Sequence, residues 1–343
     1  MLPFQPLLGI EHAFTEWSDD RYNPRADERS WEEMVTFLEE AFGSITYGTP
    51  QPSATTVEAV EYDDDGFSLT GFLAIPDSPT NGATPAVVIV PDWDGVSGPD
   101  GYESKRATLL AEAGYVAFAA DIYGSAFTQV DDFDERRNLT TLYRTDYELF
   151  VSRIQAAVDL VAAHELVDPE KVLMIGYCFG GTGVVDYAFA DLQNVKAVVP
   201  FHGGLTSLAP VETDAVYPYV LVQSGGTDDA HGNNTELEMT LNAAAATWEI
   251  TRYSNVNHGF TDWAGDAYNE LADWRSWDAM LNVFDMILSE SGGGMNHTEG
   301  GDDHGEEGGE GEGSPSDVSS ACTISFVGRS FAAVVAAALT IFY

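Results

Sequence analysis

The sequence predicts an α/β fold in which a doubly wound, mostly parallel sheet is covered by helices on both faces. Between Val57 and Leu288, short apolar runs alternate with segments of helical periodicity, as in strands joined by crossover helices. One run, Ala86–Val90, is continuously apolar and rich in β-branched residues, which is typical of a strand buried on both faces. Chemistry in such sheets collects at the carboxyl ends of the strands, so candidate residues are expected just after strands.

The expected elements begin with a hairpin and continue with strands and helices in turn. Strands at Val57–Tyr62 and Ser68–Ile75 flank the turn Asp63–Gly66, whose Asp-Asp-Asp-Gly sequence strongly favours a hairpin. The helical stretch Asp132–His164 is too long for one globular helix, so we expect a break within it. The other expected strands are Tyr115–Ala119, Val172–Ile175, Ala197–Pro200, Tyr219–Val222 and Trp248–Tyr253. The other expected helices are Glu103–Ala113, Thr182–Ala190, Glu236–Ala246 and Tyr268–Leu288.

Composition excludes several classes of partner and site. The 343-residue chain has 56 Asp and Glu against 14 Lys and Arg, a formal net charge of −42. So acidic a surface repels phosphate backbones, which argues against nucleic acid as a partner. Only Cys178 and Cys322 are cysteines, too few for a disulfide framework or a zinc cluster. No phosphate-binding or dinucleotide-binding glycine motif is present, so we expect neither a metal nor an organic cofactor.

A nucleophile motif follows the predicted strand Val172–Ile175. Gly176-Tyr177-Cys178-Phe179-Gly180-Gly181 has the pattern Gly-x-nucleophile-x-Gly and leads into a helix. A sharp strand-to-helix turn strains the nucleophile's backbone, and glycines on either side avoid steric clashes. The positive end of the helix favours a thiolate. A lone cysteine is more often an apolar core residue, but this position at a strand-to-helix junction favours a nucleophile.

A nucleophilic thiol needs a base and an acid that orients it. The expected chain order is nucleophile, acid, histidine. An acid follows the strand Tyr219–Val222, where Asp228 is preferred and Asp229 is the alternative. The histidine expected after Trp248–Tyr253 is His258. Its rivals are His202, which follows another strand, and His231, on the loop that carries the acid.

These motifs together resemble the dienelactone hydrolase family (carboxymethylenebutenolidase-like). The resemblance covers about residues 55–290 and is carried by Val90–Gly95, Gly114–Ala117, Asp121–Gly124, Gly176–Gly181 and Asn257–Phe260. It implies the α/β-hydrolase fold, a Cys178–Asp228–His258 triad, and a small-molecule ester or lactone as substrate. It also implies an oxyanion hole formed by the backbone amides of Phe179 and Trp93.

The chain departs from the family pattern at residues that tune the thiol or bind substrate. Asp92 stands where family members have a glutamate that helps control ionisation of the thiol. Asp262 stands where members acting on the dienelactone carboxylate have an arginine, and a second family arginine is matched by Arg136 or Arg137. An anion in place of a cation predicts a neutral or differently charged ester or lactone. The alternatives to catalysis are a non-catalytic cell-surface binding module on the same fold and a redox-sensing thiol.

An internal repeat predicts a tandem duplication. The segment His12-Ala-Phe-Thr-Glu-Trp17 recurs as His258-Gly-Phe-Thr-Asp-Trp263, and identities continue at the same offset as far as Met34 and Met280. Residues 1–43 are therefore expected to be the C-terminal end of an upstream copy, joined by a linker at 44–54 to one complete copy at 55–290. The natural protein is then expected to have a further N-terminal portion. The alternative is an N-terminal helix, Trp31–Phe42, that only packs on the domain.

The C-terminal region changes character. Residues 291–320 are rich in Gly, Ser, Asp and Glu and predict a solvated linker. Residues 321–343 form an apolar tail that resembles a glycosylphosphatidylinositol attachment signal, with a transmembrane tail as the alternative. Either would attach the protein to a membrane at the cell surface if a signal peptide precedes it; otherwise we expect a cytoplasmic protein. Asn138, Asn233 and Asn296 begin sequons and are glycosylation candidates on the secretory route.

Overall fold

The computed structural model describes one body of the chain. The described residues are 13–17, 20–41, 43, 52, 57–127, 130–190, 192–211, 215, 217–228 and 234–292. Contacts divide the chain into two compact units, Met1–Gly294 and Met295–Tyr343, and all described residues belong to the first. The predicted linkers at 44–54 and 291–320 therefore lie almost wholly, and the predicted apolar tail entirely, outside the described residues. Within the described residues, no helix is both long and apolar enough to span a bilayer.

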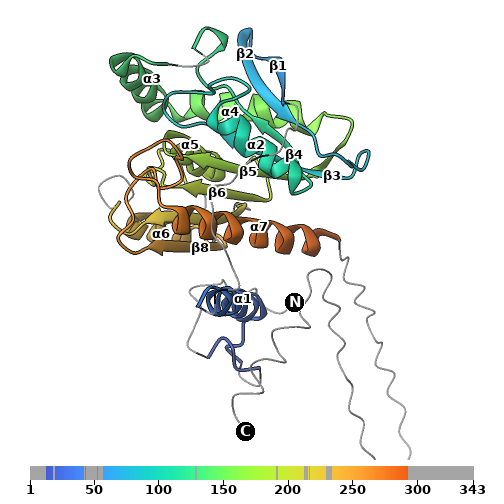
Figure 1. Cartoon of the computed structure of the whole chain (residues 1–343), viewed down its shortest axis with the longest axis vertical. Helices are drawn as coiled ribbons and strands as arrows, with labels where there is room; N and C mark the ends of the chain where they lie inside the picture. Colours follow the sequence, from blue (N-terminus) through green and yellow to red (C-terminus); the bar gives the residue numbers. More distant parts are fainter. Residues whose placement is uncertain are drawn as a thin grey trace, which may run out of the picture. The chain divides into compact units, whose positions relative to one another are not determined.

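A mostly parallel sheet forms the centre of the domain (Figure 1). Its strand order is β1-β2-β4-β3-β5-β6-β7-β8. The hairpin β1–β2 and the pair β2–β4 are antiparallel, and every other neighbouring pair is parallel. The strands are β1 (Val57–Asp64), β2 (Phe67–Ala74), β3 (Thr84–Val90), β4 (Val116–Ala119), β5 (Val167–Tyr177), β6 (Ala197–Phe201), β7 (Tyr219–Gly225) and β8 (Trp248–Tyr253). This confirms the predicted fold class.

Helices cover both faces of the sheet and bury two separate apolar layers. On one face, α2 (Tyr102–Glu112) and α7 (Glu270–Gly292) contribute side chains such as Leu110 and Phe284. The other layer contains residues of α3 (Phe133–Thr145), α4 (Tyr147–Ala162), α5 (Phe179–Phe189) and α6 (Asn234–Ala243). Strands buried on both faces read as continuous apolar runs for this reason. A short 3-10 helix at Ser125–Phe127 and the N-terminal helix α1 (Pro24–Ala41) complete the described elements.

The expected break within 132–164 occurs at Asp146. This residue ends α3 and begins α4, and its side chain accepts a hydrogen bond from the backbone N–H of Leu149. A carboxylate that satisfies a free N–H at a helix start stabilises the new helix rather than continuation of the old one. The sequence therefore encodes two helices where periodicity alone suggests one.

Several element ends differ from the sequence-based expectation. Strand β5 is longer than Val172–Ile175 because it also pairs near its start, where Val167 lies opposite Thr84 across an irregularity in register. Helix α5 begins at Phe179 instead of Thr182 because the strand turns directly into the helix at Cys178. Helix α7 begins after Asn269, whose side-chain oxygen accepts a hydrogen bond from the N–H of Ala272.

Candidate active site

Cys178 lies on a strained turn between β5 and α5. Its backbone angles are φ 50° and ψ −107°, a left-handed conformation that is unfavourable for a residue with a Cβ. A Cβ on Gly176 would overlap the carbonyl oxygen of Gly180, and a Cβ on Gly180 would overlap the carbonyl oxygens of Val90 and Pro91. The two glycines of the motif thus permit close backbone packing, which holds the thiol at the carboxyl end of the sheet.

The structure brings Cys178, His258 and Asp228 together from three loops. The Nε2 atom of His258 lies 3.1 Å from the Sγ atom of Cys178, and its Nδ1 atom lies 2.9 Å from Oδ2 of Asp228. The three segments follow β5, β7 and β8, which are parallel strands of one sheet with β6 between β5 and β7, so the side chains lie at the same end of the sheet. Asp228 is buried, whereas Cys178 is half-buried and within reach of a ligand.

The rival histidine His202 does not contact the thiol. Its Nε2 atom lies 2.8 Å from Oγ1 of Thr261, and its ring packs edge-on against the ring of His258 at 5.1 Å between centroids. Burial, followed by the nearby charge of His258, lowers its pKa well below the usual histidine value. A neutral, buried His202 therefore supports the His258 ring. The alternatives His231 and Asp229 lie outside the described residues.

The electrostatic environment favours a proton on His258. Burial lowers its pKa, but hydrogen bonds to Asp228 and Cys178 and their negative charges outweigh burial and raise it to about 10. An imidazolium between a carboxylate and a sulfur stabilises negative charge on that sulfur. The arrangement is the one that a nucleophilic thiolate requires.

Two carboxyl groups have raised pKa values: Asp92, which is half-buried beside the thiol, and Glu103, which is buried. Burial raises the pKa of Asp92 well above its usual value, and the charges of Asp94, Glu103 and Cys178 act in the same direction. Burial also raises the pKa of Glu103 to about 8, with Asp94 contributing. With a pKa of about 8, Glu103 is favoured in its neutral form at neutral pH, and the raised pKa of Asp92 shifts that group in the same direction. Asp92, one methylene shorter than the family glutamate, is thus close enough to Cys178 for the two to interact electrostatically.

The two residues expected to supply oxyanion donors flank the thiol. Phe179 is the first residue of α5, and the first N–H groups of a helix have no partner within that helix. Trp93 follows β3 and lines the same cavity as Cys178; its carbonyl oxygen, in the peptide after the expected donor, accepts a hydrogen bond of 3.0 Å from the Tyr123 hydroxyl. Both positions suit an acyl oxygen bound beside Cys178.

A cavity of about 640 Å³ opens over the thiol. It is lined by Trp93, Arg144, Cys178, Thr182, Gly204, Thr206, Leu208 and His258. A larger hollow of about 880 Å³ lies against α4. Neither Cys178 nor His258 lines it, so we do not assign the reaction to this hollow. The cavity over the thiol is large enough for a small ester or lactone.

The cation in the cavity lining is Arg144, which the sequence analysis missed. Its guanidinium lies 5.8 Å from the centre of the Phe179 ring. The expected Arg136 is instead bonded to the Val130 carbonyl, faces Asp94 at 3.7 Å, and packs over the Trp93 ring. Arg144 lies four residues after the buried Thr140, so the two share a face of α3, and this spacing was the only sequence signal for Arg144.

Other predicted positions lie away from the thiol. Arg137 is exposed and pairs with Asp134 on its own helix. Asp262 is not among the residues that line the cavity, and its Oδ1 accepts a hydrogen bond from the N–H of Ala264. Asn138 is exposed on α3, whereas Asn233 and Asn296 lie outside the described residues.

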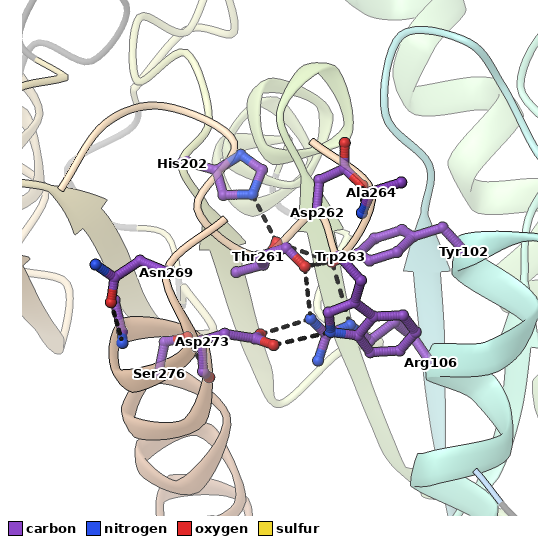
Figure 2. Close-up of polar contacts among 11 residues, drawn as sticks. Tyr102, Arg106, His202, Thr261, Asp262, Trp263, Ala264, Asn269, Asp273 and Ser276 are labelled. Carbon is purple, nitrogen blue, oxygen red and sulfur yellow. Dashed lines mark hydrogen bonds and ion pairs between the residues drawn. The ribbon is translucent and has the colours of Figure 1, made fainter. Parts of the chain in front are cut away.

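A buried cluster anchors the loop that carries His258 (Figure 2). Arg106 of α2 donates from Nη2 to the Thr261 carbonyl at 3.0 Å and to Oδ1 of Asp273 at 2.5 Å. Trp263 donates to the other oxygen of Asp273 at 2.9 Å, and the Tyr102 hydroxyl bonds Thr261. The cluster ties the loop to α2 and α7 at once. Sequence reasoning missed it because Arg106 is far from its partners in the chain.

Comparisons with known proteins agree with this architecture. Residues 69–288 match the model of the dienelactone hydrolase family. A candidate carboxymethylenebutenolidase of Aquifex aeolicus (strain VF5) is 26% identical over 241 residues, which cover 67% of this chain and 99% of that protein. A dienelactone hydrolase-like promiscuous phosphotriesterase from metagenomic libraries has 30% identity and a TM-score of 0.61, over 68% of this chain and 99% of its own.

A second solved structure, named m3DLH, is also 30% identical and superposes with a TM-score of 0.63 over the same shares of the two chains. The family match spans the turn at Cys178, the loops that carry Asp228 and His258, and nearly all of the sheet. The resemblance predicted from short motifs is thereby confirmed. The chain belongs to the dienelactone hydrolase family and is an ester or lactone hydrolase.

Proposed function

We propose that this hydrolase cleaves its ester or lactone through Cys178, with His258 as the proton carrier and Asp228 as its orienting acid. The main support is a continuous chain of contacts, which runs from Oδ2 of Asp228 through the two ring nitrogens of His258 to Sγ of Cys178. Each group sits on a loop at the same end of the sheet, and the nucleophile occupies the strained turn typical of such enzymes.

The first half-reaction forms a thioester. With its proton on Nε2 of His258, the sulfur of Cys178 attacks the carbonyl carbon, and the carbonyl π electrons move to oxygen. The amides of Phe179 and Trp93 stabilise that oxyanion; loss of one such donor typically lowers the rate about 100-fold or more. The oxyanion collapses, the C–O bond breaks, and the leaving alkoxide takes the proton from His258.

The second half-reaction returns the enzyme to its starting state. Neutral His258 removes a proton from water, which attacks the thioester carbon. The C–S bond breaks, and the sulfur leaves as a thiolate beside the newly protonated imidazolium. Asp228 stays ionised throughout and holds the ring in one orientation. The product is a carboxylic acid, and every proton is carried by this chain or by water.

The charges around the site favour a neutral acyl group. Asp92 interacts electrostatically with Cys178, Asp94 and Glu103, and Glu103 interacts with Asp262, so acidic groups are concentrated beside Asp92. Arg144 stands in the cavity lining and provides the positive charge there. We expect neutral aryl esters to be hydrolysed faster than the anionic dienelactone, and Arg144→Gln to lower the rate for the anionic compound more than for the neutral one. Preference for the dienelactone in the wild type would contradict this assignment.

The nucleophile is tested by trapping the acyl group. Incubation with a p-nitrophenyl ester at low pH, followed by rapid quenching and peptide mass spectrometry, should place the added acyl mass on the peptide that contains Cys178. Cys178→Ala should abolish both the adduct and turnover. Turnover without an adduct, and unaffected by this substitution, would overturn the thioester pathway while leaving the family membership intact.

Labelling with iodoacetamide at pH 6 distinguishes catalysis from the alternatives. A thiolate paired with His258 should react quickly, and His258→Ala should slow the reaction because the positive charge beside the sulfur is lost. A slow rate that His258→Ala leaves unchanged would favour a binding module. Fast labelling without hydrolysis of any ester would favour a redox-sensing thiol.

A further inference from the structure

The segment before α1 and α1 itself repeat the local structure of the segment that ends in α7. The N–H of Trp17 donates to Asp27 at 2.8 Å, and the equivalent N–H of Trp263 donates to Asp273 at 2.9 Å. Three further hydrogen bonds of the first segment have an equivalent 246 residues later. The Ala26–Asn23 bond corresponds to Ala272–Asn269, and the Ser30–Asp27 bond corresponds to Ser276–Asp273. The backbone bond Asn23–Phe14 corresponds to Asn269–Phe260. The repeat is therefore one of folded structure as well as of sequence.

The two copies differ in how far their apolar side chains are buried. In α7, Met280, Val283 and Phe284 are fully buried against the sheet. Their equivalents in α1 are exposed: Met34 by 40%, Phe37 by 56% and Leu38 by 39%. Trp17 and Trp31 are exposed by 80% and 61%, and with these three residues they form what we call the α1 face. The α1 face is thus a core-forming surface that this domain leaves uncovered.

The opposite side of α1 is attached to the domain by ion pairs. Arg29 is buried and contacts Glu249 of β8 at 3.0 Å. Arg275 of α7 donates two hydrogen bonds of 2.6 Å to the carboxylate of Glu40. In an α-helix, Arg29 and Glu40 lie on the side opposite Trp31 and Met34. The attachment therefore uses the polar side of α1 and directs the α1 face away from it.

The α7 copy shows what covers such a face. There, Arg106 of α2 packs its guanidinium 4.4 Å from the centre of the Trp263 ring and pairs with Asp273, while the sheet covers Met280 and Phe284. In α1, Trp17 and Asp27 present the same pair of groups. The matching surface is a sheet face together with a helix that offers a buried arginine.

We propose that the α1 face is a docking surface for the body of a second domain of the dienelactone hydrolase family, in which it takes the place of the final helix. The occupant is a sheet with a helix equivalent to α2, whose arginine packs over the Trp17 ring and pairs with Asp27, as Arg106 does with Trp263 and Asp273. The ion pairs of Arg29 and Arg275 then form the contact between two adjacent hydrolase domains. The proposal is independent of the chemistry assigned to Cys178.

The test is an elongated chain in which residues 50–257 are repeated directly before His12. This junction reproduces the natural step from Asn257 to His258, so the added body meets the α1 segment in register. We expect amide exchange in 24–41 to slow at least about tenfold compared with the 343-residue chain. Acrylamide quenching of Trp17 and Trp31 should fall, and their emission should shift to shorter wavelength.

The matched control is Met34→Lys combined with Phe37→Lys. In the 343-residue chain these side chains are exposed, so the melting temperature should not change. In the elongated chain the same substitutions should remove the added protection and the emission shift.

Three results would overturn the proposal. One is unchanged exchange in 24–41 while the added body is folded. A second is an added body that stays unfolded beside a folded downstream domain. The third is self-association of the 343-residue chain that the lysine substitutions abolish, because the α1 face would then pair with another copy of itself.

Discussion

The segments 13–41 and 259–287 have nearly the same local structure but opposite surroundings. Both form the same turn, the same Trp-to-Asp hydrogen bond and the same helix start. One buries its apolar face in the core that supports His258, and the other exposes it. Hydrogen bonds between neighbouring residues are thus encoded locally, whereas their energetic weight depends on what packs against them. Paired substitutions at equivalent positions test this difference.

The largest difference is expected for the two histidines. His258→Ala should lower kcat/KM for a neutral ester by about 1,000-fold or more, because the thiol loses its proton acceptor and its stabilising charge. His12→Ala should leave kcat/KM unchanged, since His258 already contacts Cys178. The measurement is initial-rate kinetics on purified variants with matched circular dichroism. Equal losses in both variants would mean that the copies share one function.

The next largest difference is expected between Asp273 and Asp27, in the unfolding free energy that each substitution costs. Asp273→Ala leaves the guanidinium of Arg106 buried without its carboxylate, which typically costs about 3–5 kcal/mol of unfolding free energy. Asp27→Ala loses exposed or half-buried hydrogen bonds only, and we expect about 1 kcal/mol or less. Urea unfolding followed by circular dichroism measures both. A similar cost at the two sites would show that Asp27 has a buried partner of its own.

Two equivalent methionines isolate the contribution of burial. Met280→Ala empties a fully buried site and should cost about 2–4 kcal/mol. Met34→Ala removes an exposed side chain, and the expected change is within about 0.5 kcal/mol. Thermal unfolding of the 343-residue chain gives the comparison directly. A large effect of Met34→Ala would mean that the α1 face is already covered in this chain.

A pH dependence of stability is expected for one histidine. Hydrogen bonds to Asp228 and Cys178 raise the folded-state pKa of His258 to about 10, against about 6.5 when unfolded. A raised histidine pKa stabilises the fold fully below pH of about 6.5, and this stabilisation is lost as pH rises towards about 10. The unfolding free energy of wild type minus that of His258→Gln should therefore fall over this window.

Much of the fold was predictable because its signals lie close together in the chain. The apolar run of β3 predicts a strand, because a strand buried on both faces needs continuous apolar side chains. The glycines around Cys178 predict a sharp turn, because such a turn leaves no room for side chains at those positions. The chain order of Cys178, Asp228 and His258 was likewise readable, because each follows a strand of a parallel sheet. The break at Asp146 was expected from length, although its position was not.

The residues that the sequence analysis missed depend on distant partners. Arg144 lines the cavity from α3, whereas Arg136, which the sequence analysis proposed together with Arg137, faces Asp94. Arg106 acquires its role only where α2, α7 and the loop after β8 converge. No short-range pattern distinguishes such an arginine from a solvent-exposed one.

By itself the sequence determined the strands, the sharp turn at Cys178 and the local shape of both repeated segments, because these depend on backbone preferences and neighbouring side chains. Only the tertiary structure decided which copy is buried, which histidine meets Cys178 at 3.1 Å, and which carboxyl groups are forced towards the neutral form. The physical reason is that desolvation and long-range contact set these properties, and both exist only after the chain has packed.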